Sequence, residues 1–199
     1  MSVVSARTLR YFPMLLAIQV LTLLLVAVTM ATALAHALEF PGKRRLDETA
    51  YLDVQTIYYP GFTIAGLAEP VSAIATLVLF YMFRANRVAS VLILTAFVAL
   101  AAMHVIFWIF TQPVNKFWLR RQRLTSLGKR FFSAGAARTG TAHSTSGRSR
   151  SGSMEPDQVE SRAENWQRMR DRWEYSHLVR AVLSLIALIT LNVALLVYS

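Results

Sequence analysis

Residues 88–112, VASVLILTAFVALAAMHVIFWIFTQ, decide the fold, because this long stretch carries no charged side chain. A helix needs about 20 apolar residues to cross the roughly 30 Å hydrocarbon core of a bilayer. Three further stretches meet this length, at about 12–38, 60–83 and 175–198. Inside lipid every backbone polar group must be paired, and a helix pairs its own. The sequence therefore predicts an all-α integral membrane protein, built as an antiparallel four-helix bundle.

The composition of the 199 residues excludes several classes of protein. Hydrophobic residues make up 55% of the chain and charged residues only 16%, whereas about 25% of a typical soluble domain is charged. This argues against a soluble enzyme, a disordered protein and a nucleic-acid binder. The absence of cysteine excludes disulfides, thiolate metal sites and a cysteine nucleophile. The sequence also lacks a Walker loop, a serine elbow and a dinucleotide-binding glycine motif.

The first apolar stretch also admits an interpretation as a cleaved signal peptide. Arg7 and Arg10 would be its basic start, and Ala33-Leu34-Ala35 would be its cleavage site. A signal core spans only about 7–15 residues, whereas this stretch is far longer. We therefore predict that helix one is retained.

The connections between the helices differ in length. Residues 84–87 form a tight turn, and Pro41-Gly42 in the first connection is expected to break the helix. The long third connection is predicted to hold a low-complexity, disordered insert at 124–155. An amphipathic helical extension of the fourth span is expected at 156–174, so that the whole chain, 1–199, forms a single membrane domain.

The basic residues predict the orientation. Only Arg7, Arg10, Arg84 and Arg87 lie on one side of the spans, whereas the other side holds residues 43–45 and all the Lys and Arg of the long connection. Since basic residues favour the cytoplasmic side, the long basic loop is expected in the cytoplasm, close to anionic lipid headgroups. The arginines expected to face these headgroups from the extension are Arg162, Arg168, Arg170 and Arg172. A plain, solvated extension of the fourth helix is an equally open interpretation.

Polar side chains gather at the end of the bundle next to the long connection. On helices three and four they recur at spacings of 4, 3 and 4, which places each set on one helical face. The sets are His36, Glu39 and Lys43 on helix one; Tyr58, Tyr59, Thr63 and Glu69 on helix two; His104, Trp108, Thr111 and Asn115 on helix three; and Trp173, His177, Arg180 and Ser184 on helix four.

Glu69 is the deepest ionisable group of this cluster. A charge at the bilayer centre costs about 2.5–3.5 kcal/mol even on lenient insertion scales, and such groups usually mark function. We therefore expect Glu69 to pair with Arg180 or with a histidine. A clamp that only orders the bundle is an equally open interpretation of this pair.

The histidines and carboxylates leave open whether the protein holds a cofactor. A metal or haem held through His36, His104 and His177 is one alternative, and no cofactor is the other. The His-x-x-Glu order at 36–39 is the reverse of the Glu-x-x-His order in di-iron bundles, and no second such pair follows.

Five strings of the sequence stand out: HALEFPGKRRLD at 36–47, VQTIYYPGF at 54–62, GLAEP at 66–70, FTQPVNKFW at 110–118 and RWEYSHLVRAVL at 172–183. In their order and spacing they resemble the anthrone-oxygenase-like family of small four-helix membrane proteins, most of which have no known function. Members with an assigned activity oxidise anthrones to anthraquinones. The long insert between helices three and four departs from the family's pattern. The positions that the resemblance marks are His36, Glu39, Lys43, Gln55, Tyr59, Glu69, Pro113, Asn115, Trp173, His177 and Arg180.

Three functions remain open from the sequence. The first is a membrane oxygenase or oxidoreductase acting on a lipophilic, anthrone-like aromatic, with His177 or His36 as base, Arg180 and Lys43 stabilising the anion, and Glu69 orienting the base. The second is a non-catalytic scaffold or assembly partner. The third, a small transporter, is less favoured because no inverted repeat or broken helix is evident. In the oxygenase interpretation, the residues expected to bind the substrate are Glu39, Tyr59, Trp108, Thr111, Asn115 and Trp173. The sequence does not predict an oligomeric state.

Overall fold

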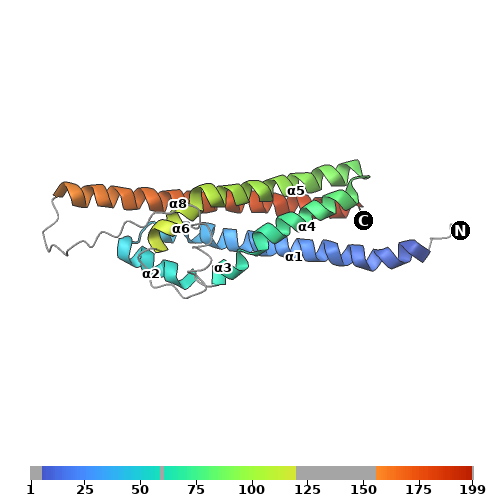
Figure 1. Ribbon diagram of the computed structural model, residues 1–199, viewed down its shortest axis with the longest axis horizontal. Coiled ribbons are helices and arrows are strands. Elements are labelled where there is room, and N and C mark those ends of the chain that lie inside the picture. The colour runs from blue at the N-terminus through green and yellow to red at the C-terminus, as the bar shows by residue number, and fades with distance from the viewer. Residues whose placement is uncertain (1–5, 59–60, 120–155, 199) are drawn as a thin grey trace, which may run out of the picture.

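The computed structural model describes residues 6–58, 61–119 and 156–198, and every element in these ranges is a helix. The long helices α1 (Ala6–Lys43), α4 (Ala68–Phe83), α5 (Arg87–Ile106) and α8 (Pro156–Tyr198) run antiparallel (Figure 1). Four segments are long and apolar enough to cross a membrane, which confirms the predicted four-helix membrane protein. They are Pro13–Lys43, Gly61–Phe83, Arg87–Trp118 and Glu164–Val197. The predicted insert at 124–155 and Tyr59 lie outside the described residues.

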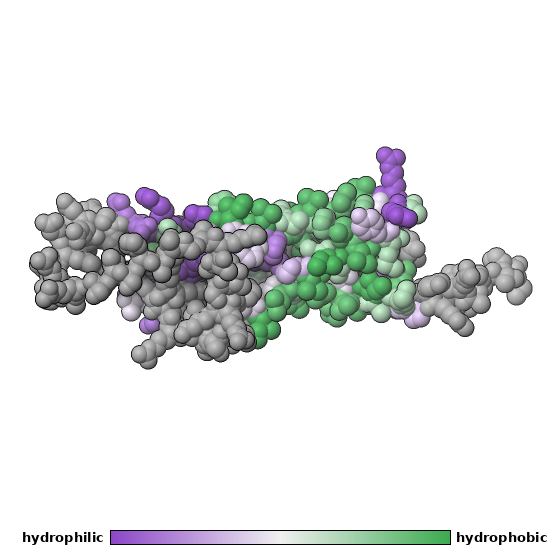
Figure 2. Space-filling model, in the orientation of Figure 1, coloured by the Kyte–Doolittle hydropathy of each residue, from purple (hydrophilic) through white to green (hydrophobic). Residues whose placement is uncertain are grey.

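The two ends of the bundle differ in chemistry. In the half of the bundle that leads to the turn between α4 and α5 the core is mostly apolar, although Thr22 and Thr76 are also buried there. The outer surface of this half of the spans is largely hydrophobic (Figure 2). Hydrophilic residues gather toward the opposite end, where α1 ends. The small side chains of Ala33 and Ala181, with Met103, form a separate buried layer next to the polar end. The residues that form the apolar core include Val26, Leu79, Ile93, Leu100 and Leu191.

The second span is a broken helix, contrary to the sequence expectation of unbroken spans. α3 (Gly61–Ala65) ends before Gly66, and α4 begins at Ala68. A Cβ atom on Gly66 would lie 3.1 Å from the carbonyl oxygen of Phe62, so glycine suits this close turn. The break places Glu69 in the first turn of α4. There the positive end of the helix dipole favours a carboxylate.

The third span contains one turn of π-helix. This turn, η1 (Phe107–Thr111), lies between α5 and α6 (Gln112–Leu119). The amide of Gln112 bonds the carbonyl of Phe107, five residues back. The carbonyl of Ile109 instead accepts a 2.7 Å hydrogen bond from Arg172 Nη2 on α8. A side chain of α8 thus donates a hydrogen bond to the backbone of the π-turn.

The expected break at Pro41-Gly42 is wrong, because α1 continues through both residues to Lys43. The Nζ atom of Lys43 lies 2.8 Å from Glu39 Oε2 one turn earlier, and Lys43 is only 3% exposed. This ion pair joins a buried lysine to a partly exposed carboxylate and spans the last turn of α1. The connection that follows contains a further helix, α2 (Glu48–Tyr58), which the sequence analysis did not predict.

The N-terminal part of α8 extends well beyond the bilayer. At 43 residues the helix is about 65 Å long at 1.5 Å per residue. Trp166 packs with Tyr51 and Trp118 in a buried cluster, so this extension is anchored to α2 and α6. Arg170 is buried over the Trp166 ring, so its expected place among the headgroups is wrong. Arg168 is exposed.

The other two arginines of the predicted extension, Arg162 and Arg172, lie near its two ends. Arg172 is exposed but donates to the carbonyl of Ile109, so its guanidinium already has a protein partner. The side chain of Arg162 lies outside the described residues. Contact with anionic headgroups therefore stays a prediction for Arg162 and Arg168.

Cysteine labelling tests the predicted orientation, since the chain has no cysteine of its own. Single substitutions Arg45→Cys and Thr145→Cys are expected to react with a membrane-impermeant maleimide only from the cytoplasmic side. Ala85→Cys, in the turn between α4 and α5, is expected to react only from the opposite side. Reaction of residues 45 and 145 from different sides would contradict the antiparallel arrangement.

Candidate functional site

A cavity of about 300 Å³ lies at the polar end of the bundle. Its volume is at the lower end of the range of about 300–1,000 Å³ that holds small organic ligands. All four membrane-spanning segments and α2 contribute to its wall. The residues that line it include His36, Gln55, Tyr58, Phe62, Glu69, His104, Phe107, Trp108, Thr111, Asn115, Trp173, His177 and Arg180.

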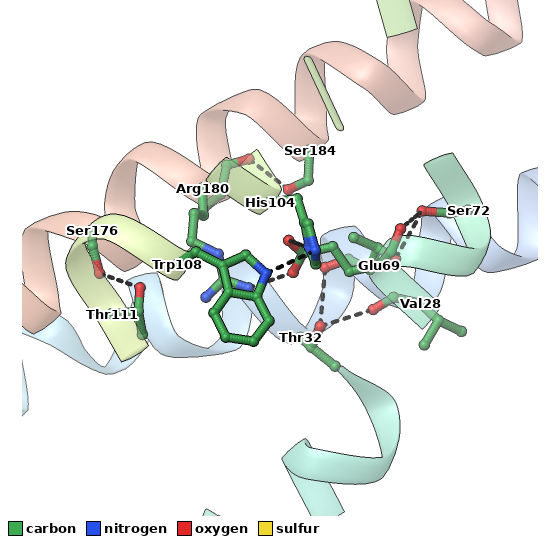
Figure 3. A network of polar contacts seen from close by, with 12 residues as sticks. Val28, Thr32, Glu69, Ser72, His104, Trp108, Thr111, Ser176, Arg180 and Ser184 are labelled. Atoms are coloured by element: carbon green, nitrogen blue, oxygen red, sulfur yellow. Dashed lines mark hydrogen bonds and ion pairs between the residues drawn. The ribbon is translucent and has the colours of Figure 1, made fainter. Parts of the chain in front are cut away.

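Glu69 holds two of the lining side chains together. Its Oε2 atom accepts a 2.6 Å hydrogen bond from Arg180 Nη2, and its Oε1 atom lies 3.2 Å from His104 Nδ1 (Figure 3). Glu69 and Arg180 are 4% and 9% exposed, so the ion pair is screened from solvent and lipid. The sequence predicted that Glu69 would pair with Arg180 or with a histidine, and in the structure it contacts both.

The contact with Trp108 indicates which ring nitrogen of His104 carries the proton. The indole Nε1–H only donates, and it lies 2.9 Å from His104 Nε2. His104 Nε2 must therefore accept, which leaves the ring proton on Nδ1 to donate to Glu69. Trp108 is 49% exposed within a membrane-spanning segment, so this edge of the cavity faces lipid.

Two further histidines lie together in the cavity wall. The rings of His36 and His177 are 4.5 Å apart, edge to face, and both residues are buried. His177 packs against Trp173 in a tilted arrangement, with ring centroids 3.9 Å apart. Phe62 lies 4.4 Å from the His36 ring. Two imidazoles therefore sit among aromatic side chains, next to Arg180 on the turn of α8 after His177.

Comparison with models of known protein families shows to which family this chain is related. A model of the anthrone oxygenase family matches residues 55–190, about two thirds of the chain. The chain belongs to the anthrone oxygenase family. No curated protein and no solved structure matches it. The matched region contains Glu69, His104, His177 and Arg180, whereas His36 precedes it.

In this anthrone oxygenase family member, two predicted site residues lie behind the cavity wall. Lys43 Nζ is 3.3 Å from His36 Nδ1, and Tyr58 donates a 2.6 Å hydrogen bond to Glu39 Oε2. Neither Lys43 nor Glu39 lines the cavity. Both can therefore act on a bound ligand only through the wall residues that they contact, which are His36, Tyr58 and Trp173.

The other predicted residues of the wall are held by hydrogen bonds. Thr111 bonds Ser176 across the helix interface at 2.8 Å. Trp173 Nε1 donates to Asn115 Oδ1, also at 2.8 Å. Sequence analysis missed Phe62 and Phe107, which carry no polar signal of their own. The π-turn that begins at Phe107 explains the second omission, because it cannot be read from hydropathy.

The histidines and carboxylates at the cavity do not form a joint site with three protein ligands for a metal ion. Among the residues that the structure describes, no group of three or more His, Asp or Glu side chains is placed to hold a metal ion. His104 already uses both ring nitrogens, for Trp108 and Glu69. The alternative in which His36, His104 and His177 act as common ligands therefore does not fit this arrangement.

A second polar pair lies under α2, outside the cavity. Tyr51 donates a 2.7 Å hydrogen bond to Glu174 Oε1, and both residues are almost fully buried. Burial, followed by the nearby Glu174 carboxylate, raises the pKa of Tyr51 above its ordinary value. Burial and the hydrogen bond to Glu39 likewise raise the pKa of Tyr58. Both phenols therefore remain protonated where an exposed tyrosine ionises.

These pKa shifts predict a loss of stability at high pH. An unfolded tyrosine ionises near pH 10, and a raised folded pKa contributes stability that is complete below that value and lost as the pH rises above it. The thermal midpoint is therefore expected to fall as the pH rises above about 10. Tyr51→Phe should flatten this fall, whereas the exposed Tyr81→Phe should not. Parallel curves for all three proteins would contradict the assignment.

Proposed function

We propose that this protein is a membrane oxygenase that oxidises a lipophilic, anthrone-like aromatic with molecular oxygen. The observation that carries the proposal is the pair His36 and His177, which share one aromatic-walled cavity with Arg180 inside a membrane-spanning bundle. Membership of the anthrone oxygenase family supports the substrate class. The break at Gly66 removes one of the two sequence arguments against a transporter, because broken helices occur in that class, whereas the sequence still shows no inverted repeat.

The chemistry of an anthrone needs a base, an anion site and oxygen. Removal of one methylene proton by a base sends the C–H electron pair into the ring system and onto the carbonyl oxygen. The methylene carbon of this anion then forms a C–O bond with O₂, and protonation gives a hydroperoxide. Loss of the second C–H proton and of hydroxide breaks the O–O bond and leaves a carbonyl. One anthrone and one O₂ thus give one anthraquinone and one water, without a further reductant.

The cavity contains groups suited to each of these steps. His36 or His177 can take the methylene proton, since both line the cavity. Arg180 can stabilise the anionic oxygen, and its salt bridge to Glu69 keeps the guanidinium oriented beforehand. The rings of Phe62, Phe107 and Trp108 offer apolar surfaces to a flat ligand.

The lipid-facing edge of the cavity fits a substrate that partitions into the bilayer. Leu67 and Trp108 both line the cavity and are 55% and 49% exposed. Both belong to membrane-spanning segments, so their exposed surfaces contact lipid. A lipophilic aromatic can therefore reach the site without passing through water.

Oxygen consumption by the purified protein in lipid nanodiscs tests the proposal. With anthrone added, we expect anthraquinone formation and O₂ uptake in equal amounts, faster than in empty nanodiscs, because free anthrone also oxidises slowly. Anthrones bearing different ring hydroxyls should be compared, since the substituents are not specified. Rates equal to those of empty nanodiscs for every anthrone would reject the oxygenase and favour the scaffold or transport interpretation.

A further inference from the structure

We propose that the two cavity histidines have opposite and fixed roles. His177 is the base, His36 is a hydrogen-bond donor to the ligand, and Lys43 is a positioning residue that acts through His36. The assignment of His177 as base and His36 as donor toward a ligand rests on the proposed oxidation. The proton positions that these roles require, however, are properties of the protein without substrate.

The contact with Lys43 sets the proton of His36. A lysine ammonium has three donors and no acceptor, and its Nζ atom lies 3.3 Å from His36 Nδ1. The ring nitrogen must therefore accept. The Glu39 Oε2 atom is 3.8 Å from the same nitrogen, too far for a hydrogen bond that would require a proton there. The ring proton of His36 consequently lies on Nε2.

The surroundings of Lys43 keep this contact in place. Its ammonium lies 4.6 Å from the centre of the Tyr58 ring and 5.0 Å from that of Trp173. Both distances are typical of cation–π contacts. Glu39 supplies the opposite charge at 2.8 Å, and Tyr58 donates to the same carboxylate oxygen. With these three residues around it, Lys43 is only 3% exposed, and its ammonium lies next to His36.

The backbone sets the opposite tautomer in His177. Its Nδ1 atom lies 2.9 Å from the carbonyl oxygen of Trp173, which can only accept. The proton of the neutral ring therefore lies on Nδ1, and the lone pair lies on Nε2. His177 is 4% exposed and lines the cavity, so this lone pair is the basic group that it offers.

Together the two rings select a ligand with two complementary features. It needs an acidic hydrogen for His177 and a conjugated oxygen that becomes negative for His36 and Arg180. In the proton transfer the ligand C–H bond breaks and an N–H bond forms at His177 Nε2, while the electron pair moves onto the ligand oxygen. No electron is transferred to another molecule in this step. The class of ligand is therefore an enolisable aromatic ketone.

Nitrogen NMR of the full chain in nanodiscs, with ¹⁵N-labelled histidine and no substrate, tests the assignment. Losses of signal in His36→Gln and His177→Gln identify the two rings. We expect a protonated Nε2 and bare Nδ1 in His36, and the reverse in His177. Proton positions other than these in the wild-type protein would overturn the proposal, whatever the variants do.

The role of Lys43 is tested by two variants and a control. Lys43→Met keeps the apolar stem but removes the donor, so His36 should shift from one tautomer to a mixture of two. Lys43→Arg keeps the donors and should restore the wild-type pattern, and the exposed Arg45→Met should leave it unchanged. A single unchanged tautomer in Lys43→Met would reject the positioning role. The expected NMR pattern without anthrone oxidation would leave these proton positions standing and reject only the oxygenase.

Discussion

Replacing Arg180 with alanine is expected to destabilise the protein by about 3–5 kcal/mol, the usual cost of removing one partner from a buried ion pair. Arg180 donates to Glu69 at 2.6 Å, and both side chains are at least nine-tenths buried. The variant leaves a carboxylate inside the bundle with His104 as its remaining partner. We expect a large fall in the thermal midpoint in detergent micelles.

Glu69→Gln is the informative companion of this variant. The single amide oxygen can still accept the hydrogen bond from Arg180, while the amide NH2 takes the place of the oxygen that faces His104. Because no unpaired carboxylate is left inside the bundle, we expect a smaller loss of stability than in Arg180→Ala. The control is Arg84→Ala, an exposed arginine in the turn between α4 and α5. If Arg180→Ala unfolds at the wild-type temperature, the pair does not stabilise the bundle.

Helical spacing was sufficient to predict the inward face of α8. Trp173, His177 and Arg180 recur at 4 and 3 residues, and all three are buried along the cavity wall. The reason is physical: in a lipid-facing bundle, polar side chains that share one face must turn inward to find partners. The same argument predicted that Glu69 would meet Arg180 or a histidine, and it meets both.

Features that depend on contacts between distant segments could not be predicted in this way. The break at Gly66 and the π-turn at Phe107 both lie inside apolar stretches, where hydropathy shows no interruption. In the π-turn, the carbonyl of Ile109 also accepts a hydrogen bond from Arg172, more than sixty residues later in the chain. Periodicity carries no information about such a contact.

Lys43 shows a different limit of sequence reasoning. It begins a run of three basic residues, and such runs usually mark the cytoplasmic side of a span. Arg44 and Arg45 are indeed exposed, whereas Lys43 is buried against Tyr58 and Trp173. Whether a lysine at a membrane boundary turns outward or inward depends on the rings that later parts of the chain provide.

His177→Gln is expected to lower the rate of anthrone oxidation by about 100- to 10,000-fold, the usual contribution of a general base. Glutamine is close to histidine in size, but neither its amide nitrogen nor its oxygen is basic enough to remove a carbon-bound proton. The rate of anthraquinone formation in nanodiscs measures the effect. Asn192→Ala, an exposed site farther along the same helix, is the control and should retain the wild-type rate.

His36→Gln should lower the same rate much less than His177→Gln, because the two histidines differ in what they offer a ligand. The contact with Lys43 makes His36 a donor, and a glutamine amide can still donate a hydrogen bond to an anionic oxygen. No glutamine can replace the lone pair that the Trp173 carbonyl leaves on His177 Nε2. If His36→Gln were the more damaging of the two substitutions, the base would be on α1, and the order of roles derived from the hydrogen bonds would be reversed.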